Sequence, residues 1–251
     1  MFEISHQGSV SVLTLSHPPA NAIGHAWLVE FENILDQLEG NDQTSILHIR
    51  SDQKIFCAGA DLKEYRQRME SGESPEQYKA YLQNFHRLFG RLENLAKLTV
   101  SEIGGAALGG GFELALSCDL RIAAHEAKLG LPEGRLGLIP GAGGTQRITR
   151  LCGPSVANRI ILACDIVDGK TALDLGMVQW AVPRAELAAT ADELIDGWSG
   201  LSSAAILAAK KCIAAALDPA QNGFAKEIEV SLDLVQDQDT QSRVAAFFEN
   251  N

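Results

Sequence analysis

The stretch AALGGGFEL, residues 106–114, places three consecutive glycines at the start of residues 112–117, a segment whose pattern predicts a helix. Glycine loses more conformational freedom on folding than any other residue, so this cluster indicates unusual backbone angles or a close backbone approach. One interpretation is a tight turn from a strand into a helix. The other is that bare amides at the start of the helix bind a negatively charged oxygen.

Two glutamates accompany the glycine-rich sequence. Glu113 follows two residues after Gly111, where the helix dipole alone favours an acidic side chain. Glu133 has apolar flanks, which predict a partly desolvated carboxylate with a raised pKa. Two carboxylates in different environments are a common route to paired acid and base roles. Their spacing in the sequence does not show whether they converge.

On both sides of the glycine-rich sequence, predicted strands alternate with predicted helices along the chain. This alternation predicts βαβ units and a mainly parallel sheet. After Val182 the pattern becomes helical throughout, so the last part of the chain is a helical extension. The predicted strands are 2–5, 9–15, 46–49, 98–103 and 120–124, and the predicted helices are 27–38, 62–69, 78–95, 112–117, 187–198, 204–217, 224–234 and 240–248.

The composition excludes several classes of protein. The 251-residue chain has a net charge of -11, which argues against nucleic acid, although a few local lysines could still bind a small anion. The five scattered cysteines form no C-x-x-C pair, so neither a disulfide framework nor a zinc site is expected. The N-terminus lacks a basic region and no apolar run could span a bilayer, so a cytoplasmic location is expected.

Four motifs in order resemble those of the crotonase superfamily, the enoyl-CoA hydratases and isomerases, and most closely those of the hydratases. They are FCAGADL at residues 56–62, AALGGGFEL at 106–114, LPE at 131–133 with LIPGAGGTQR at 138–147, and DLGMV at 174–178. The early motif departs from the pattern, because SHPPANAI at residues 16–23 lacks the family's arginine. The C-terminal motif is reduced to AFFE at residues 246–249, without a cation that relatives often place there for CoA.

This resemblance implies an α/β fold of repeated ββα units with a C-terminal helical region. Residues 1–183 would form the core with the active site, and residues 184–251 a helical trimerisation region. The expected assembly is a homotrimer, or a hexamer built as a dimer of trimers. Neither a membrane nor nucleic acid is an expected partner.

The resemblance also assigns roles to residues of this chain. The amides of Ala60 and Gly110 would form an oxyanion hole, with Glu113 and Glu133 as the catalytic pair. The expected substrate-binding residues are Lys54, Ala58, Gly59, Asp61, Leu62 and Lys63, with solvated surface charge as the alternative for the two lysines. No metal or redox cofactor is implied, because the oxyanion hole would perform the electrophilic role, and coenzyme A is part of the substrate.

Both glutamates being present favours a hydratase that adds water across the double bond of a 2-enoyl-CoA. Glu113 would activate the water toward Cβ and Glu133 would deliver a proton to Cα. Isomerases of the family commonly keep only the second acid. An isomerase or an acyl-CoA hydrolase of the same fold therefore remains the alternative, and a binding protein that kept the fold without activity is a third possibility.

Overall fold

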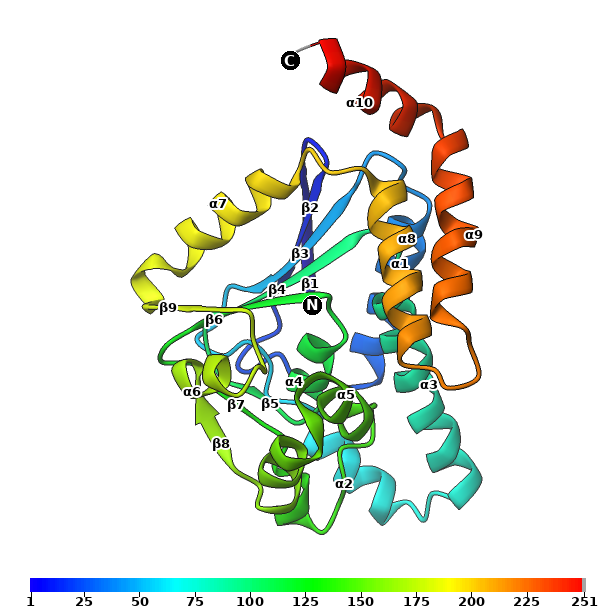
Figure 1. The fold of residues 1–251 in the computed structure, drawn as a ribbon. Helices are drawn as coiled ribbons and strands as arrows, with labels where there is room; N and C mark the ends of the chain where they lie inside the picture. Colours follow the sequence, from blue (N-terminus) through cyan, green and yellow to red (C-terminus); the bar gives the residue numbers. More distant parts are fainter. Residues whose placement is uncertain (250–251) are drawn as a thin grey trace.

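The computed structural model describes residues 1–249 as a mixed α/β fold with a helical C-terminal region (Figure 1). The strands are β1 (Phe2–Gln7), β2 (Val10–Leu15), β3 (Ile46–Ser51), β4 (Leu98–Ile103), β5 (Ala107–Leu108), β6 (Leu120–Ala124), β7 (Lys128–Gly130), β8 (Ile166–Asp168) and β9 (Trp180–Val182). The α-helices are α1 (His25–Glu39), α2 (Leu62–Glu70), α3 (Pro75–Glu93), α4 (Gly110–Leu116), α5 (Gly144–Ala157), α6 (Gly169–Asp174), α7 (Leu187–Trp198), α8 (Ser203–Ala216), α9 (Gly223–Gln236) and α10 (Gln238–Glu249). Shorter helical turns are η1 (Pro132–Leu136), η2 (Asn158–Leu162) and η3 (Arg184–Glu186).

The larger sheet has the strand order β1-β2-β3-β4-β6-β9. Only the β1–β2 hairpin is antiparallel, and the other four pairs are parallel. A second sheet, β5-β7-β8, lies beneath it in the view of Figure 1. Strand–strand–helix units recur along the chain as β1-β2-α1, β4-β5-α4 and β6-β7-α5. The predicted parallel sheet and the predicted ββα architecture are both confirmed.

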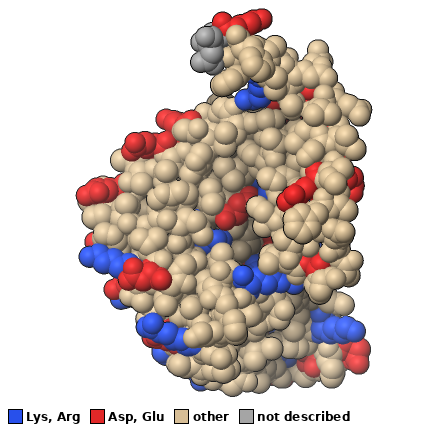
Figure 2. Space-filling view, in the orientation of Figure 1, with Lys and Arg blue, Asp and Glu red and all other residues tan. Residues whose placement is uncertain are grey.

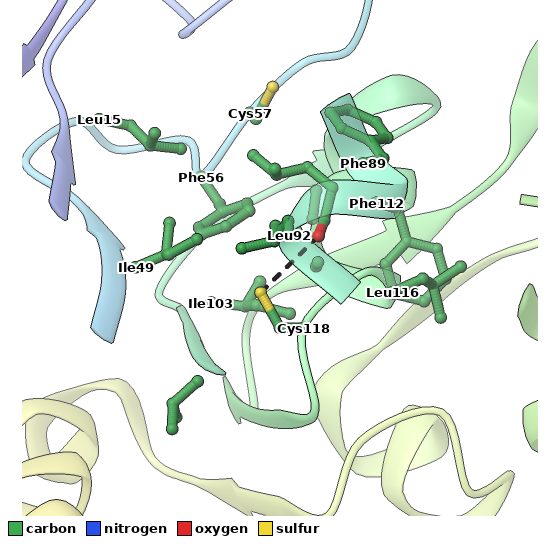
Figure 3. Packing of buried hydrophobic residues seen from close by; sticks show 14 of the residues in the cluster. Leu15, Ile49, Phe56, Cys57, Phe89, Leu92, Ile103, Phe112, Leu116 and Cys118 are labelled. Carbon is green, nitrogen blue, oxygen red and sulfur yellow. Dashed lines mark hydrogen bonds between the residues drawn. The ribbon is translucent and has the colours of Figure 1, made fainter. Parts of the chain in front are cut away.

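The main core joins the sheet to the helices that carry the site. Phe56 and Phe112 are fully buried and belong to one hydrophobic cluster together with Phe89 of α3 (Figure 3). Complete burial of such a side chain contributes about 1.5–3 kcal/mol to the stability of the folded state. Since Phe56 precedes one candidate oxyanion loop and Phe112 follows the other, the core fixes the two loops relative to each other.

Boundaries differ from the sequence prediction where local capping decides them. Helix α3 begins at Pro75 rather than at residue 78, because Ser74 and Gln77 form a reciprocal capping box. Helix α4 begins at Gly110 and so includes two of the three glycines. Strands β5, β7, β8 and β9 are only two or three residues long and gave no periodic signal.

The C-terminal helices differ in how they contact the core. Helix α7 buries Leu187, Ala191 and Ile195, and α8 is joined to the core by an ion pair from Lys210 to Asp119. By contrast, α9 and α10 leave large apolar side chains exposed, and α10 projects beyond the rest of the molecule (Figure 1). The division at residue 183 and the trimerisation role stay predictions, and residues 250–251 lie outside the described part.

Charged side chains of both signs are interspersed on the face in Figure 2, without a single basic patch. Across the described residues, no helix combines the length and the apolar character needed to cross a membrane.

Candidate active site

Two glycine-containing segments run side by side in the structure. The Cys57 amide donates to Ala106 at 3.0 Å, and the Leu108 amide donates back to Cys57 at 3.0 Å. A Cβ atom at Gly111 would lie 2.1 Å from the Cys57 carbonyl oxygen, so only glycine permits this approach. The close approach explains one glycine of the cluster and brings residues 57–60 against residues 107–111.

This contact places two backbone amides beside each other. A Cβ atom at Gly110 would lie 3.5 Å from the Ala60 nitrogen. Within residues 1–249, the N–H groups of Ala60 and Gly110 have no hydrogen-bond acceptor, and both residues line the same pocket. Unpaired N–H groups that converge in a pocket can donate to a developing oxyanion.

Glu113 lies on the helix that follows these amides, α4. Its side chain is buried, and its Oε1 atom accepts hydrogen bonds from the amides of Ala142 at 2.8 Å and Gly144 at 2.7 Å. Burial raises the pKa of Glu113 to about 7, against the lowering effect of these two amides. The charge of Glu133 raises the pKa further. A carboxylate with this pKa can exchange protons near neutral pH.

Glu133 reaches the same pocket from η1. Its Oε1 atom would be 3.0 Å from a Cβ atom at Gly109. Its Oε2 atom is buried and has no hydrogen-bond partner among the described residues. Burial also raises the pKa of Glu133. The two carboxylates therefore converge, which their sequence spacing could not show.

The pocket has a volume of about 230 Å³ and a largely apolar wall. Beside the two carboxylates and the two amides, its lining includes Leu82 and Phe85 of α3 and Leu138 and Ile139 of the loop after η1. An apolar cavity with a few convergent polar groups is typical of a small-molecule site.

Not every predicted site residue reaches this pocket. Ala58, Gly59 and Leu62 line it. Asp61 instead caps α2, where its carboxylate accepts from the amides of Lys63 and Glu64. Lys54 and Lys63 are exposed and lie outside the pocket lining, so their contact with a substrate stays a prediction.

Several residues of the site were not singled out from the sequence. Ala142 and Gly144 bind Glu113, and both belong to the LIPGAGGTQR stretch, whose resemblance to the family motif does not by itself indicate this contact. Tyr65, Tyr78 and Tyr81 line the pocket, and the last two share a face of α3 at helical spacing. Burial raises the pKa of Tyr81 to about 12, so its phenol stays protonated.

No cluster of three or more histidine, cysteine or acidic side chains is placed to hold a metal within residues 1–249. The five cysteines are all free.

Comparison with known proteins identifies similar chains. A family model described as "Enoyl-CoA hydratase/isomerase" matches residues 5–251. A probable enoyl-CoA hydratase of Bacillus subtilis is 43% identical over 67% of this chain, and the match spans 64% of that protein. Probable enoyl-CoA hydratase 2, mitochondrial, of Arabidopsis thaliana is 37% identical over 91% of this chain and 75% of its own length. The crystal structure of enoyl-CoA hydratase from Bacillus anthracis superimposes with a TM-score of 0.91, at 32% identity, over 100% of this chain and 96% of that one.

Proposed function

Since the chain belongs to the enoyl-CoA hydratase/isomerase family, we propose that it adds water across the double bond of a 2-enoyl-CoA to give a 3-hydroxyacyl-CoA. One observation carries the proposal: the buried carboxylate of Glu113 and the partly buried carboxylate of Glu133 face one pocket that also holds two unpaired amides. A hydratase needs one group to take a proton from water, a second to give a proton to carbon, and donors for the charge that forms between these steps.

The amides of Ala60 and Gly110 receive the thioester carbonyl oxygen in this mechanism. As water attacks Cβ, the electrons of the double bond move to that oxygen and form an enolate. Each donor of such a pair typically contributes about 2.7–4 kcal/mol to transition-state stabilisation. Because the Ala60 and Gly110 N–H groups have no acceptor within residues 1–249, no internal hydrogen bond must break when the substrate binds.

The two carboxylates divide the proton transfers. Ionised Glu113 takes a proton from the attacking water, whose oxygen bonds to Cβ. Protonated Glu133 then donates its proton to Cα as the enolate collapses, so the product has gained one molecule of water. A proton returns from Glu113 to Glu133 by way of solvent before the next turnover. The pKa of Glu113, raised to about 7, supports proton exchange near neutral pH, and the raised pKa of Glu133 favours its protonated form.

The remaining predictions concern the carrier and the assembly. Backbone at Ala58, Gly59, Asp61 and Leu62 would contact the CoA moiety, and Lys54 and Lys63 would approach its phosphates. The enzyme would be cytoplasmic and would form a homotrimer or a hexamer. It would need no cofactor, because the amide pair supplies the electrophilic role.

The proposal is tested with crotonyl-CoA and longer 2-enoyl-CoAs by following the loss of the conjugated thioester absorbance. In ¹⁸O-labelled water, the product should carry the label on Cβ. No turnover at any chain length would reject the proposal. Migration of the double bond without incorporation of label would identify an isomerase, and release of free CoA would identify a hydrolase. If no acyl-CoA raises the melting temperature either, the chain does not bind this class of ligand.

A further inference from the structure

The loop that binds Glu113 also accepts a hydrogen bond from an arginine side chain. Arg147 lies in the first turns of α5 and reaches back over the loop, where its Nη1 donates to the Ala142 carbonyl at 2.9 Å. Ala142 is therefore fixed at both of its polar backbone groups, because its amide donates to Glu113 at 2.8 Å. A Cβ atom at Gly143 would lie 2.2 Å from Nη1, so the guanidinium passes directly over that residue.

A third element anchors the same guanidinium. Its Nε and Nη2 atoms both donate to Oε2 of Glu93, the last residue of α3, at 3.1 and 2.8 Å. Arg147 is only 10% exposed, whereas Glu93 is 44% exposed. Because a guanidinium presents its donors in a rigid planar fork, the Glu93 contact fixes the direction of Nη1 toward Ala142.

We propose that Arg147 is a positioning residue of the active site, which, oriented by Glu93, holds the amides of Ala142 and Gly144 against the carboxylate of Glu113. Arg147 does not line the pocket, so it acts on Glu113 through this loop and through its charge. The inference rests on the proposed function, in which ionised Glu113 accepts a proton from water.

Electrostatics supports the same role. The charged groups that act on Glu113 are Glu133 from η1, which raises its pKa, and Arg147 from α5, which lowers it. The amides of Ala142 and Gly144 also lower the pKa. Loss of Arg147 removes a favourable charge and releases the amides, so both effects favour the protonated form of Glu113.

The test uses Arg147→Gln, Arg147→Lys and Glu93→Gln in the full-length protein. The titration of Glu113 is followed by NMR of glutamate labelled with ¹³C at the carboxyl carbon, with its signal assigned by comparison with Glu113→Gln. For Arg147→Gln, we expect the midpoint of the Glu113 titration to rise by about one pH unit, which is a tenfold change in proton affinity. Arg147→Lys and Glu93→Gln should give smaller shifts in the same direction. With crotonyl-CoA, kcat at pH 7 should fall about fivefold or more, while KM stays within about twofold.

The matched control is Arg91→Gln. Arg91 lies two residues before Glu93 on α3, but its ion pairs join α3 to Asp36 and Glu39 of α1. A purely structural role predicts that Arg91→Gln and Arg147→Gln both lower the melting temperature without moving the Glu113 midpoint. An unchanged midpoint in folded Arg147→Gln would overturn the proposal. If that variant does not fold, unchanged midpoints in Arg147→Lys and Glu93→Gln would do the same.

The NMR titration does not require turnover. A shifted midpoint in a protein that hydrates no enoyl-CoA would reject the proposed function and keep the role of Arg147. Normal hydration with an unshifted midpoint would reject the role of Arg147 and keep the proposed function.

Discussion

The Oε1 atom of Glu113 accepts a 2.7 Å hydrogen bond from the amide of Gly144, 31 residues later in the chain. This bond ties the first turn of α4 to the first residue of α5. The hydrogen bond stabilises the charged form of Glu113 and so partly compensates for the solvation that this carboxylate loses on burial. The remaining penalty leaves the pKa of Glu113 at about 7, in the range suited to proton transfer.

Replacing either carboxylate should separate chemistry from binding. Glu113→Gln and Glu133→Gln should each lower kcat for hydration of crotonyl-CoA by about 10²–10⁴-fold. The side-chain amide of glutamine can neither accept the proton that Glu113 takes from water nor donate the proton that Glu133 gives to Cα. Binding of a saturated acyl-CoA, measured by calorimetry, should change little. Near-normal turnover by either variant would contradict the assigned pair of roles.

Glu113 should also make the folded protein less stable as the pH rises. Its folded pKa of about 7 exceeds the reference value of 4.5, so the folded state holds the proton more tightly between these values. This contribution is complete below about pH 4.5 and is lost as the pH rises through 7. The free energy of unfolding of the wild type relative to Glu113→Gln should therefore fall by about 3 kcal/mol from pH 4.5 to 8. Urea unfolding of both proteins at several pH values measures this difference. If the free energies of unfolding of the wild type and of Glu113→Gln change in parallel with pH, the prediction is wrong.

The contact between the two amide loops predicts the effect of one methyl group. Gly111→Ala would place a Cβ atom 2.1 Å from the Cys57 carbonyl oxygen and so push the loops apart. Displacing an oxyanion donor should lower kcat by about 10²–10³-fold. Gly90→Ala on α3 is the control, because a Cβ atom there meets nothing within 4 Å. Equal kcat values for the two variants would show that the loop contact does not control the reaction.

The exposed lysines should affect affinity rather than chemistry. If Lys54 and Lys63 attract the CoA phosphates, Lys54→Glu with Lys63→Glu should raise KM several-fold at low salt and leave kcat unchanged. The effect should shrink at 1 M salt, where the Debye length is about 3 Å. Lys211→Glu, the same charge change at an exposed site on α8, provides the control. If the double variant, the Lys211→Glu control and the wild type all have the same KM, Lys54 and Lys63 are solvated surface charges that do not contact the substrate.

A buried arginine should be important for stability. Arg121 is 2% exposed and donates to the carbonyls of Cys118 at 2.7 Å and Met177 at 2.9 Å. Arg121→Met leaves these carbonyls unpaired and should cost about 3 kcal/mol in the free energy of unfolding. The control, Arg66→Gln, breaks an exposed pair with Glu70 and should cost less than about 0.5 kcal/mol. If chemical denaturation shows that Arg121→Met and Arg66→Gln lose the same free energy of unfolding, the burial of Arg121 does not contribute to stability.

Continuous stretches of sequence were enough to predict much of this protein. The long amphipathic segments identified α1, α3 and the C-terminal helices, because helical periodicity is a local property. The ordered motifs indicated the family, and the glycine cluster beside Glu113 indicated where the site should lie. The short strands β5 and β7 were missed because two or three residues carry no period, and pairing across the sheet decides them.

The tertiary structure decided how the groups of the site act together. Both Ala60 and Gly110 were named from their motifs, but only the packing of one loop on the other leaves their amides unpaired and adjacent. Likewise, Glu113 was visible in the sequence, whereas its burial and its bonds to Ala142 and Gly144 were not. The reason is physical: the residue type supplies a carboxylate, but desolvation and hydrogen bonds from distant backbone set its pKa.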